Sequence, residues 1–308
     1  MGDTFEVIGK YAGRRKSMNS RAAVFCSLLL AAVSFNQVSQ ADSFSERGRE
    51  IIQKNRNAIL VVRMIIKGGM SFQGMGSHQE ESKTEATGVV IDPNGLTVVP
   101  LSETDPYGQI GSLLSSSKYG KKMDIQFKSE LTDVKMILDD GKEISGKVVL
   151  RDRDLDLAFV RPLEKPAEPM AAIDLTQDAT LELLDETLCL DRMTSRYDRV
   201  PHVTAGRVKA VVEKPRRYYL VEGTTSGAPV FDLDGRILGI NLSTPGSSGD
   251  DSDSLMEYLK NAGEMVLPAA DIREAASQAP EVDAVPDEPE SSSEDVGDST
   301  ETIEQDTN

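Results

Sequence analysis

The sequence GTTSGAPVFDLDGRILGIN occupies residues 223–241 and joins a polar loop to two apolar runs. The runs, 228–231 and 237–242, are separated by Asp234-Gly235. An Asp-Gly pair between apolar runs is typical of a tight antiparallel turn, because it tolerates the positive φ angles that such turns need. The stretch therefore predicts a loop carrying Ser226, followed by two paired strands.

The same alternation of short apolar runs and turn signals continues towards the N-terminus. Pro93-Asn94-Gly95 and Asp139-Asp140-Gly141 each separate two such runs. Ten or more short strands at hairpin spacing favour antiparallel barrels or sandwiches, because parallel strands need helices between them. The predicted strands are residues 58–66, 88–91, 96–99, 134–138, 144–150, 157–160, 203–212, 218–221, 228–231 and 237–242.

Helical periodicity is confined to the edges of this β-rich region. It is found in residues 44–55, 254–262 and 269–278. Residues 69–85 and 106–122 lack apolar periodicity, so we expect both to be long surface loops.

The first 41 residues have the organisation of a secretory signal peptide. Basic residues precede an apolar run at 22–35, and Ser39-Gln40-Ala41 supplies small residues for cleavage. The run is shorter than the roughly 20 residues that span a bilayer as a helix. We therefore expect export to the periplasm or beyond the cell, with no membrane span in the mature chain. Met18 is an alternative start of the protein.

Cleavage would leave Cys189 as the one cysteine of the mature chain. An intramolecular disulfide is then impossible, and zinc ribbons and Cys-x-x-Cys redox chemistry are excluded. Leu188 and Leu190 flank this cysteine, which is typical of a buried structural thiol.

The 308 residues carry a formal net charge of −17, with 11 acidic and no basic residues in the segment 280–308. An acidic chain repels phosphate backbones, so we expect no nucleic-acid partner. The C-terminal segment has too little apolar surface to fold. The predicted organisation is a signal peptide at 1–41, a helical segment at 42–56, a β domain at 57–279 and a disordered acidic tail at 280–308.

Three patches resemble the protease domain of HtrA/Deg-type trypsin-like serine proteases. Residues 223–241 look like the nucleophile loop, in which Ser-Gly-Gly-Pro precedes a hairpin and a Gly-Ile-Asn strand. Residues 134–156 resemble the segment that ends in Asp-Leu-Ala, and residues 87–99 look like the hairpin before the catalytic histidine. Residues 265–268 are similar to the strand that closes the second barrel. The resemblance implies an all-β fold of two antiparallel six-stranded barrels over residues 57–279.

In such a fold, serine attacks the acyl carbon, histidine accepts its proton and aspartate orients the histidine. The resemblance places Ser226 at the nucleophile and Asp156 at the aspartate. The histidine position falls on Ser102, whose hydroxyl cannot act as a general base near neutral pH. His78 and His202, the two histidines of the chain, are poor replacements: one precedes the hairpin in a polar segment and the other begins a strand.

The oxyanion loop also departs from the family pattern. The glycine expected two residues before the nucleophile is replaced by Thr224, and the glycine is displaced to Gly223. A β-branched residue resists backbone conformations that glycine permits. The nucleophile loop thus consists of Thr224, Thr225, Ser226 and Gly227. An alternative register with Thr225 as the nucleophile restores the glycine but disrupts the alignment further along.

No cofactor or metal site is expected. Asp152, Asp154 and Asp156 alternate as in a calcium loop, but Leu157 and Leu163 stand where that loop needs glycine and glutamate.

The sequence therefore predicts an exported trypsin-like homologue with a vestigial triad, acting as a binding or scaffold protein. Its expected partners are peptides, unfolded protein segments or another envelope protein, and its oligomeric state stays open. The alternative is an active HtrA-like endopeptidase that uses an unrecognised base. A third alternative is a β protein unrelated to proteases.

Overall fold

The computed structural model of the protein describes residues 44–72, 75–105, 126–244 and 263–284. The predicted signal peptide, the predicted loop at 106–122 and the predicted helix at 254–262 lie outside these ranges. Within them, no helix has both the length and the apolar character that crossing a membrane requires.

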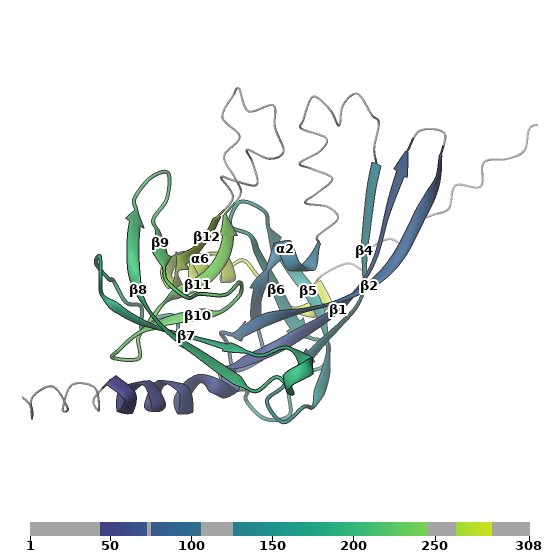
Figure 1. Ribbon diagram of the computed structural model, residues 1–308. Coiled ribbons are helices and arrows are strands. Elements are labelled where there is room, and N and C mark those ends of the chain that lie inside the picture. Colours follow the sequence, from purple (N-terminus) through teal and green to yellow (C-terminus); the bar gives the residue numbers. More distant parts are fainter. Residues whose placement is uncertain (1–43, 73–74, 106–125, 245–262, 285–308) are drawn as a thin grey trace, which may run out of the picture.

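Twelve strands of the described chain form two closed antiparallel barrels, which lie side by side (Figure 1). The predicted fold class is thereby confirmed. In order around the first barrel, the strands are β1 (Ile59–Phe72), β2 (Met75–Val90), β3 (Thr97–Pro100), β6 (Leu157–Pro162), β5 (Glu143–Asp152) and β4 (Gln126–Ile137). Those of the second are β10 (Pro229–Asp232), β11 (Ile237–Thr244), β12 (Gly263–Pro268), β9 (Tyr218–Val221), β8 (Pro201–Val212) and β7 (Glu186–Arg192).

The turns predicted from Asn-Gly and Asp-Gly pairs connect neighbouring antiparallel strands. Gly95 N–H donates to the Asp92 carbonyl at 2.8 Å in the turn between β2 and β3. Gly235 N–H donates to the Asp232 carbonyl at 3.1 Å in the turn between β10 and β11. Both glycines have positive φ angles, of 92° and 78°, which explains why glycine is needed there.

One sequence prediction about strands was wrong, and one strand was not predicted. Residues 69–85 were expected to be a surface loop, but they extend β1 and β2 into a long hairpin in which Gly68 pairs with Glu80. This ribbon projects beyond the barrel (Figure 1), so it does not need the apolar periodicity of a strand that covers a core. The strand β7 was not predicted. Its apolar run, Leu188 to Leu190, is only three residues long, and the charged Asp191 and Arg192 follow it.

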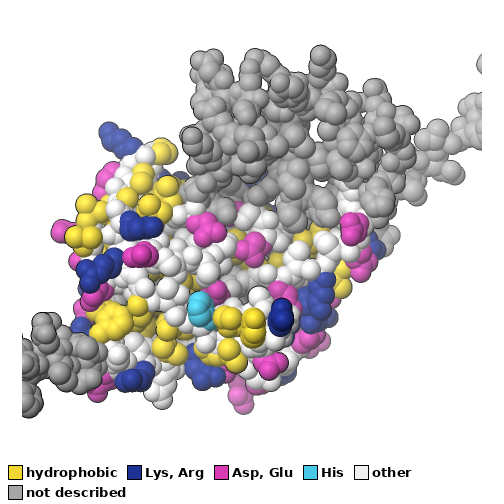
Figure 2. Space-filling view, in the orientation of Figure 1, with side chains coloured by type: hydrophobic (Ala, Val, Ile, Leu, Met, Phe, Trp, Pro, Cys, Tyr) yellow, Lys and Arg dark blue, Asp and Glu magenta, His cyan; other side chains and the backbone are white. Residues whose placement is uncertain are grey.

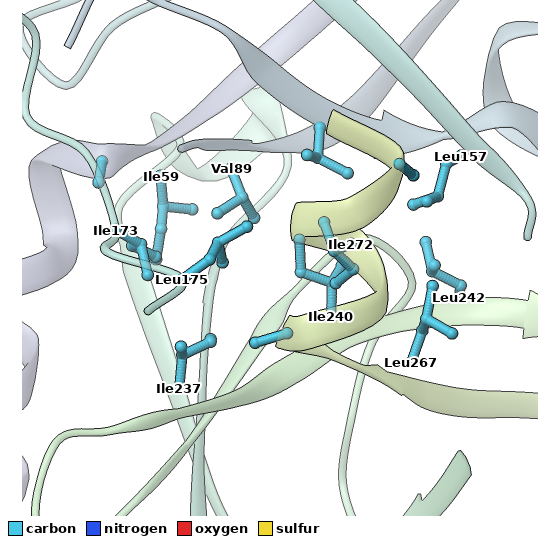
Figure 3. Close-up of a cluster of buried hydrophobic side chains, with 14 of the residues drawn as sticks. Ile59, Val89, Leu157, Ile173, Leu175, Ile237, Ile240, Leu242, Leu267 and Ile272 are labelled. Atoms are coloured by element: carbon cyan, nitrogen blue, oxygen red, sulfur yellow. The ribbon is translucent and has the colours of Figure 1, made fainter. Parts of the chain in front are cut away.

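One cluster of buried apolar side chains belongs to both barrels. Ile59 and Val89 of the first barrel are in the same cluster as Ile237 and Leu267 of the second. The helix α6 (Ala269–Ala276) contributes Ile272, which lies among the labelled side chains of both barrels in Figure 3. Burial of this shared surface fixes the barrels against each other.

Short helical segments close the ends of the fold. Residues 44–55 are helical and bury Ile51 in the shared cluster. The remaining elements are the helix α2 (Leu101–Thr104) and the 3-10 turns η1 (Arg56–Ala58), η2 (Ser195–Tyr197) and η3 (Val282–Ala284). The described fold continues past the predicted tail boundary at residue 280: Arg161 donates to the Pro280 carbonyl at 2.9 Å and pairs with Glu281 at 3.3 Å, and η3 follows.

Figure 2 shows basic and acidic side chains interspersed over the described part of one face. The charge of this face therefore does not favour one sign of partner over the other.

Candidate active site

The structure brings Ser102 and Asp156 together at the position expected for a histidine-aspartate pair. Ser102 lies on α2, directly after β3, and Asp156 directly precedes β6. Ser102 Oγ donates a hydrogen bond to Asp156 Oδ2 at 2.9 Å, and Ser102 N–H donates to Asp156 Oδ1 at 2.7 Å. The Ser102 hydroxyl thus makes the hydrogen bond to Asp156 that an imidazole would make in a catalytic triad.

Asp156 itself is held firmly. It is buried, with a positive φ of 56°, a conformation that aspartate tolerates better than most residues. Its carbonyl oxygen accepts a hydrogen bond from Leu101 N–H at 2.9 Å. Hydrogen bonds from Ser102 and Leu101 of α2 therefore hold both the side chain and the main chain of Asp156 in place.

Ser226 lies where the second barrel meets the first. A Cβ atom placed on its neighbour Gly227 would lie 2.6 Å from the Thr87 carbonyl oxygen and 3.1 Å from Pro100 Cδ. Only glycine therefore fits, and its φ of 78° also favours glycine. This close approach brings Ser226 next to α2, which begins directly after Pro100.

The loop before Ser226 takes its unusual backbone conformation at Gly223. Gly223 has a φ of 71°, whereas Thr224 is not among the described residues with positive φ. The glycine stands one residue earlier than in the family pattern, and the left-handed backbone conformation is found at that earlier residue, Gly223. The side chain of Thr224 donates from Oγ1 to the Val221 carbonyl at 3.4 Å.

Asp191 joins the nucleophile loop to the first barrel. Its carboxylate accepts hydrogen bonds from Thr225 Oγ1 at 2.7 Å and from Thr87 Oγ1 at 2.6 Å. Thr87 is part of β2 in the first barrel, and Asp191 is part of β7 in the second. Thr225 therefore serves here as an anchor of the loop, a role that the sequence did not suggest.

The backbone places His78 far along β2 from the nucleophile loop, and His202 is exposed at the start of β8. His78 is in β2, nine residues before Thr87, which corresponds to about 30 Å of extended strand. His202 is exposed near the start of β8, where it pairs with Asp191 in strand register.

Glu103 belongs to the site, although the sequence pattern did not indicate it. It is adjacent to Ser102 on α2, and burial raises the pKa of its carboxyl from 4.5 to about 7. The Ser226 hydroxyl opposes this shift, while the negative charges of Asp156, Asp191 and Glu264 add to it. The position of Glu103 next to Ser102 in the sequence is the signal that marks it.

The raised pKa of Glu103 predicts how stability depends on pH. Between about pH 4.5 and 7 the folded chain binds a proton that the unfolded chain has released, so the free energy of unfolding should fall as pH rises. Between pH 5 and pH 8, the free energy of unfolding of Glu103→Gln should fall by about 2–3 kcal/mol less than that of the wild-type chain. Urea unfolding at pH 5 and pH 8 measures it, with the exposed Glu168→Gln as control. Equal pH profiles for Glu103→Gln and the wild-type chain would contradict the assignment.

The remaining sequence expectations concern metals and the thiol. No group of three or more His, Cys, Asp and Glu side chains in the described ranges is arranged to hold a metal ion. Cys189 is buried, and burial raises the pKa of its thiol to about 11. It is therefore an unreactive structural thiol.

Comparison with known proteins identifies the family. Residues 86–240, half of the chain, match the sequence model of the trypsin-like peptidase domain. Together with the two barrels, this match shows that the chain belongs to the trypsin-like peptidase family. A β protein unrelated to proteases is thereby excluded.

More specific relatives are distant. A solved structure of the HtrA-type protease AlgW with a tripeptide is 13% identical, with a TM-score of 0.46. The alignment covers 75% of this chain and 62% of that one, so the chain spans less than two thirds of its length. No curated protein matches the chain.

Proposed function

We propose that this chain is a trypsin-like protease homologue that has lost catalysis and acts as a binding protein. The observation that carries the proposal is the hydrogen bond from Ser102 Oγ to Asp156 Oδ2, at 2.9 Å. A serine in this place satisfies the aspartate but cannot accept a proton from Ser226 near neutral pH. Without that base, the hydroxyl of Ser226 stays a weak nucleophile.

The oxyanion loop supports the same conclusion. Its left-handed residue is Gly223 rather than the residue two positions before Ser226. Loss of one oxyanion donor alone costs on the order of 100- to 1000-fold in turnover. The two defects affect the same chemical step.

The fold retained around these defects is suited to binding. Both barrels are closed, and the nucleophile loop is anchored to the first barrel through Asp191. The ligands that fit this proposal are peptides or unfolded protein segments, or another protein of the cell envelope if the chain is exported as its N-terminus predicts.

Labelling with a serine-directed fluorophosphonate tests the proposal. The purified chain should be labelled no more than its Ser226→Ala variant, and it should not cleave casein. An active trypsin-like protease in the same assay provides the positive control. Labelling or cleavage that depends on Ser226 would refute the loss of catalysis.

Glu103 favours a second candidate, a peptidase with a carboxylate base. Its carboxyl has a pKa of about 7, close to the value that suits a general base, and the Ser226 hydroxyl acts on it directly. However, the contact between Ser226 Oγ and the Glu103 carboxyl does not have the geometry of a good hydrogen bond in the described structure. If this candidate is correct, Ser226 labelling should rise with pH through about 7 and disappear in Glu103→Gln.

A further inference from the structure

The two most exposed large apolar side chains of the described residues are neighbours in the sequence. Leu183 is 60% exposed and Leu184 is 69% exposed. Both belong to the turn from Glu182 to Asp185, which we call the leucine turn. The turn is attached to β8, on the side of the second barrel that faces away from the first (Figure 1). Figure 2 shows hydrophobic side chains gathered at this end of the molecule, with side chains of both charges around them.

The leucine turn is held in one conformation by four hydrogen bonds. Asp185 N–H donates to the Glu182 carbonyl at 3.2 Å, and Glu182 N–H donates to Asp185 Oδ2 at 2.8 Å. Leu184 N–H donates to the Val208 carbonyl of β8 at 2.9 Å, and Val208 N–H donates to the Asp185 carbonyl at 3.1 Å. The backbone therefore presents both leucines to the solvent in a fixed arrangement.

This arrangement has a cost in backbone energy as well as in exposed apolar surface. Leu184 is the third residue of the turn and has a φ of 73°. Glycine or asparagine is usual at such a position, and a larger side chain costs on the order of 1 kcal/mol there. Neither the strain nor the exposure of the leucines contributes to folding of the single chain. Both are explained if a partner covers the turn.

The charges near the leucine turn are separated by sign. Its acids are Glu182 and Asp185, whereas the exposed bases Lys209, Lys214 and Arg216 lie on β8 and in the following turn. Among the described residues, no ion pair includes Glu182 or any of these three bases, although neighbouring arginines on the same barrel are paired. A surface with an acidic part, an apolar part and a basic part is complementary to a second copy of itself across a two-fold axis.

We propose that the leucine turn is the centre of a symmetric contact between two copies of this chain. Leu183 and Leu184 of one copy pack against those of the other, and Glu182 of each copy faces Lys209 of the other. A lipid surface fits less well, because Glu182 and Asp185 would face its anionic groups. The contact does not depend on the reactivity of Ser226, so it goes beyond the proposed function and is tested separately from it.

Sedimentation velocity of the purified chain tests the proposal. Over about 1 to 100 µM, the wild-type chain should pass from monomer to dimer. The double variant Leu183→Ser with Leu184→Gly should associate about 100-fold more weakly or less, because the apolar centre is removed. Glycine accepts the positive φ at position 184, so the variant should fold, as thermal unfolding verifies. Leu163→Ser is the matched control: this leucine is half exposed after β6 of the first barrel, and its variant should dimerise as wild type does.

A charge exchange tests the arrangement of the two copies. Glu182→Lys and Lys209→Glu, each alone, place like charges opposite one another in the dimer and should weaken it by about tenfold or more. An equimolar mixture of the two variants should restore dimerisation, because every 182–209 contact between unlike copies then joins opposite charges. An ion pair within one chain would not be restored by mixing, since each variant still carries two like charges.

The results that overturn the proposal are equally defined. They are a chain that stays monomeric up to about 100 µM, a dimer that the leucine double variant leaves intact, and an absence of recovery in the mixture. A monomer that binds phosphatidylglycerol vesicles, and loses this binding in the leucine double variant, would also overturn it and assign the turn to a membrane surface.

Discussion

The variant that combines Ser102→His with Thr224→Gly should gain Ser226-dependent labelling by a fluorophosphonate. An imidazole at position 102 can take over the hydrogen bond that Ser102 Oγ now donates to Asp156 Oδ2, and its other nitrogen can accept the Ser226 proton. Loss of the histidine from a triad costs on the order of a million-fold in turnover, so even partial recovery is measurable.

The two substitutions should not contribute independently. Ser102→His alone is expected to give little activity, because Thr224 still stands where the family's oxyanion loop has glycine. Thr224→Gly should then raise the labelling rate by about 100-fold. Groups that act as a unit show such non-additivity. Both variants in a Ser226→Ala background are the controls. If Ser102→His alone matched the double variant, Thr224 would not be a defect of the site.

Arg192→Ala should reduce the free energy of unfolding by about 3–5 kcal/mol. The guanidinium is only 5% exposed and pairs with Asp139 of the first barrel at 2.7 Å. It also donates to the carbonyl oxygens of Ile59, Arg56 and Arg199. Alanine would leave these three carbonyl oxygens without this donor, and Asp139 would keep only Arg56 as its partner.

Urea unfolding of Arg192→Ala measures the loss, and Arg207→Ala is its matched control. Arg207 pairs with Glu186 at 2.9 Å, but both side chains are about half exposed, so its loss should cost less than about 1 kcal/mol. Arg192→Lys, which keeps the charge, provides a measurable value if the alanine variant does not fold. Similar losses for Arg192→Lys and Arg207→Ala would contradict the role assigned to the guanidinium.

The same pair has a defined pH dependence. Burial opposes ionisation of Asp139, but hydrogen bonds from Arg192 and Arg56 outweigh it and hold the pKa below 3.8. A lowered pKa stabilises the fold above the unfolded value and loses that contribution as pH falls through the folded value. The difference between wild type and Arg192→Ala should thus persist at neutral pH and shrink only in strong acid.

The turns and the nucleophile loop could be read from the sequence because their chemistry is local. Asn94-Gly95 and Asp234-Gly235 determine their turns through backbone conformations that few other residues adopt. The pairing of Ser102 with Asp156 was expected only from the resemblance to HtrA/Deg-type proteases, which put these residues at the histidine and aspartate positions.

Other features depend on contacts that a pattern does not reveal. Backbone pairing of β1 with β2 continues through residues 69–85, although this segment lacks apolar periodicity. Glu103 owes its raised pKa to burial and to acids from distant segments. The anchor between Asp191 and Thr225 joins residues 34 positions apart, so no local signal marks it.

The shared apolar cluster has a consequence for synthesis of the chain. Ile59 and Val89 leave the ribosome early, yet they are buried together with Ile272 and Ala275, which are made near the end. A nascent chain that stops before α6 therefore presents an uncovered apolar surface, the feature that recruits chaperones and promotes aggregation. Acquisition of the native state must wait until translation has passed residue 276.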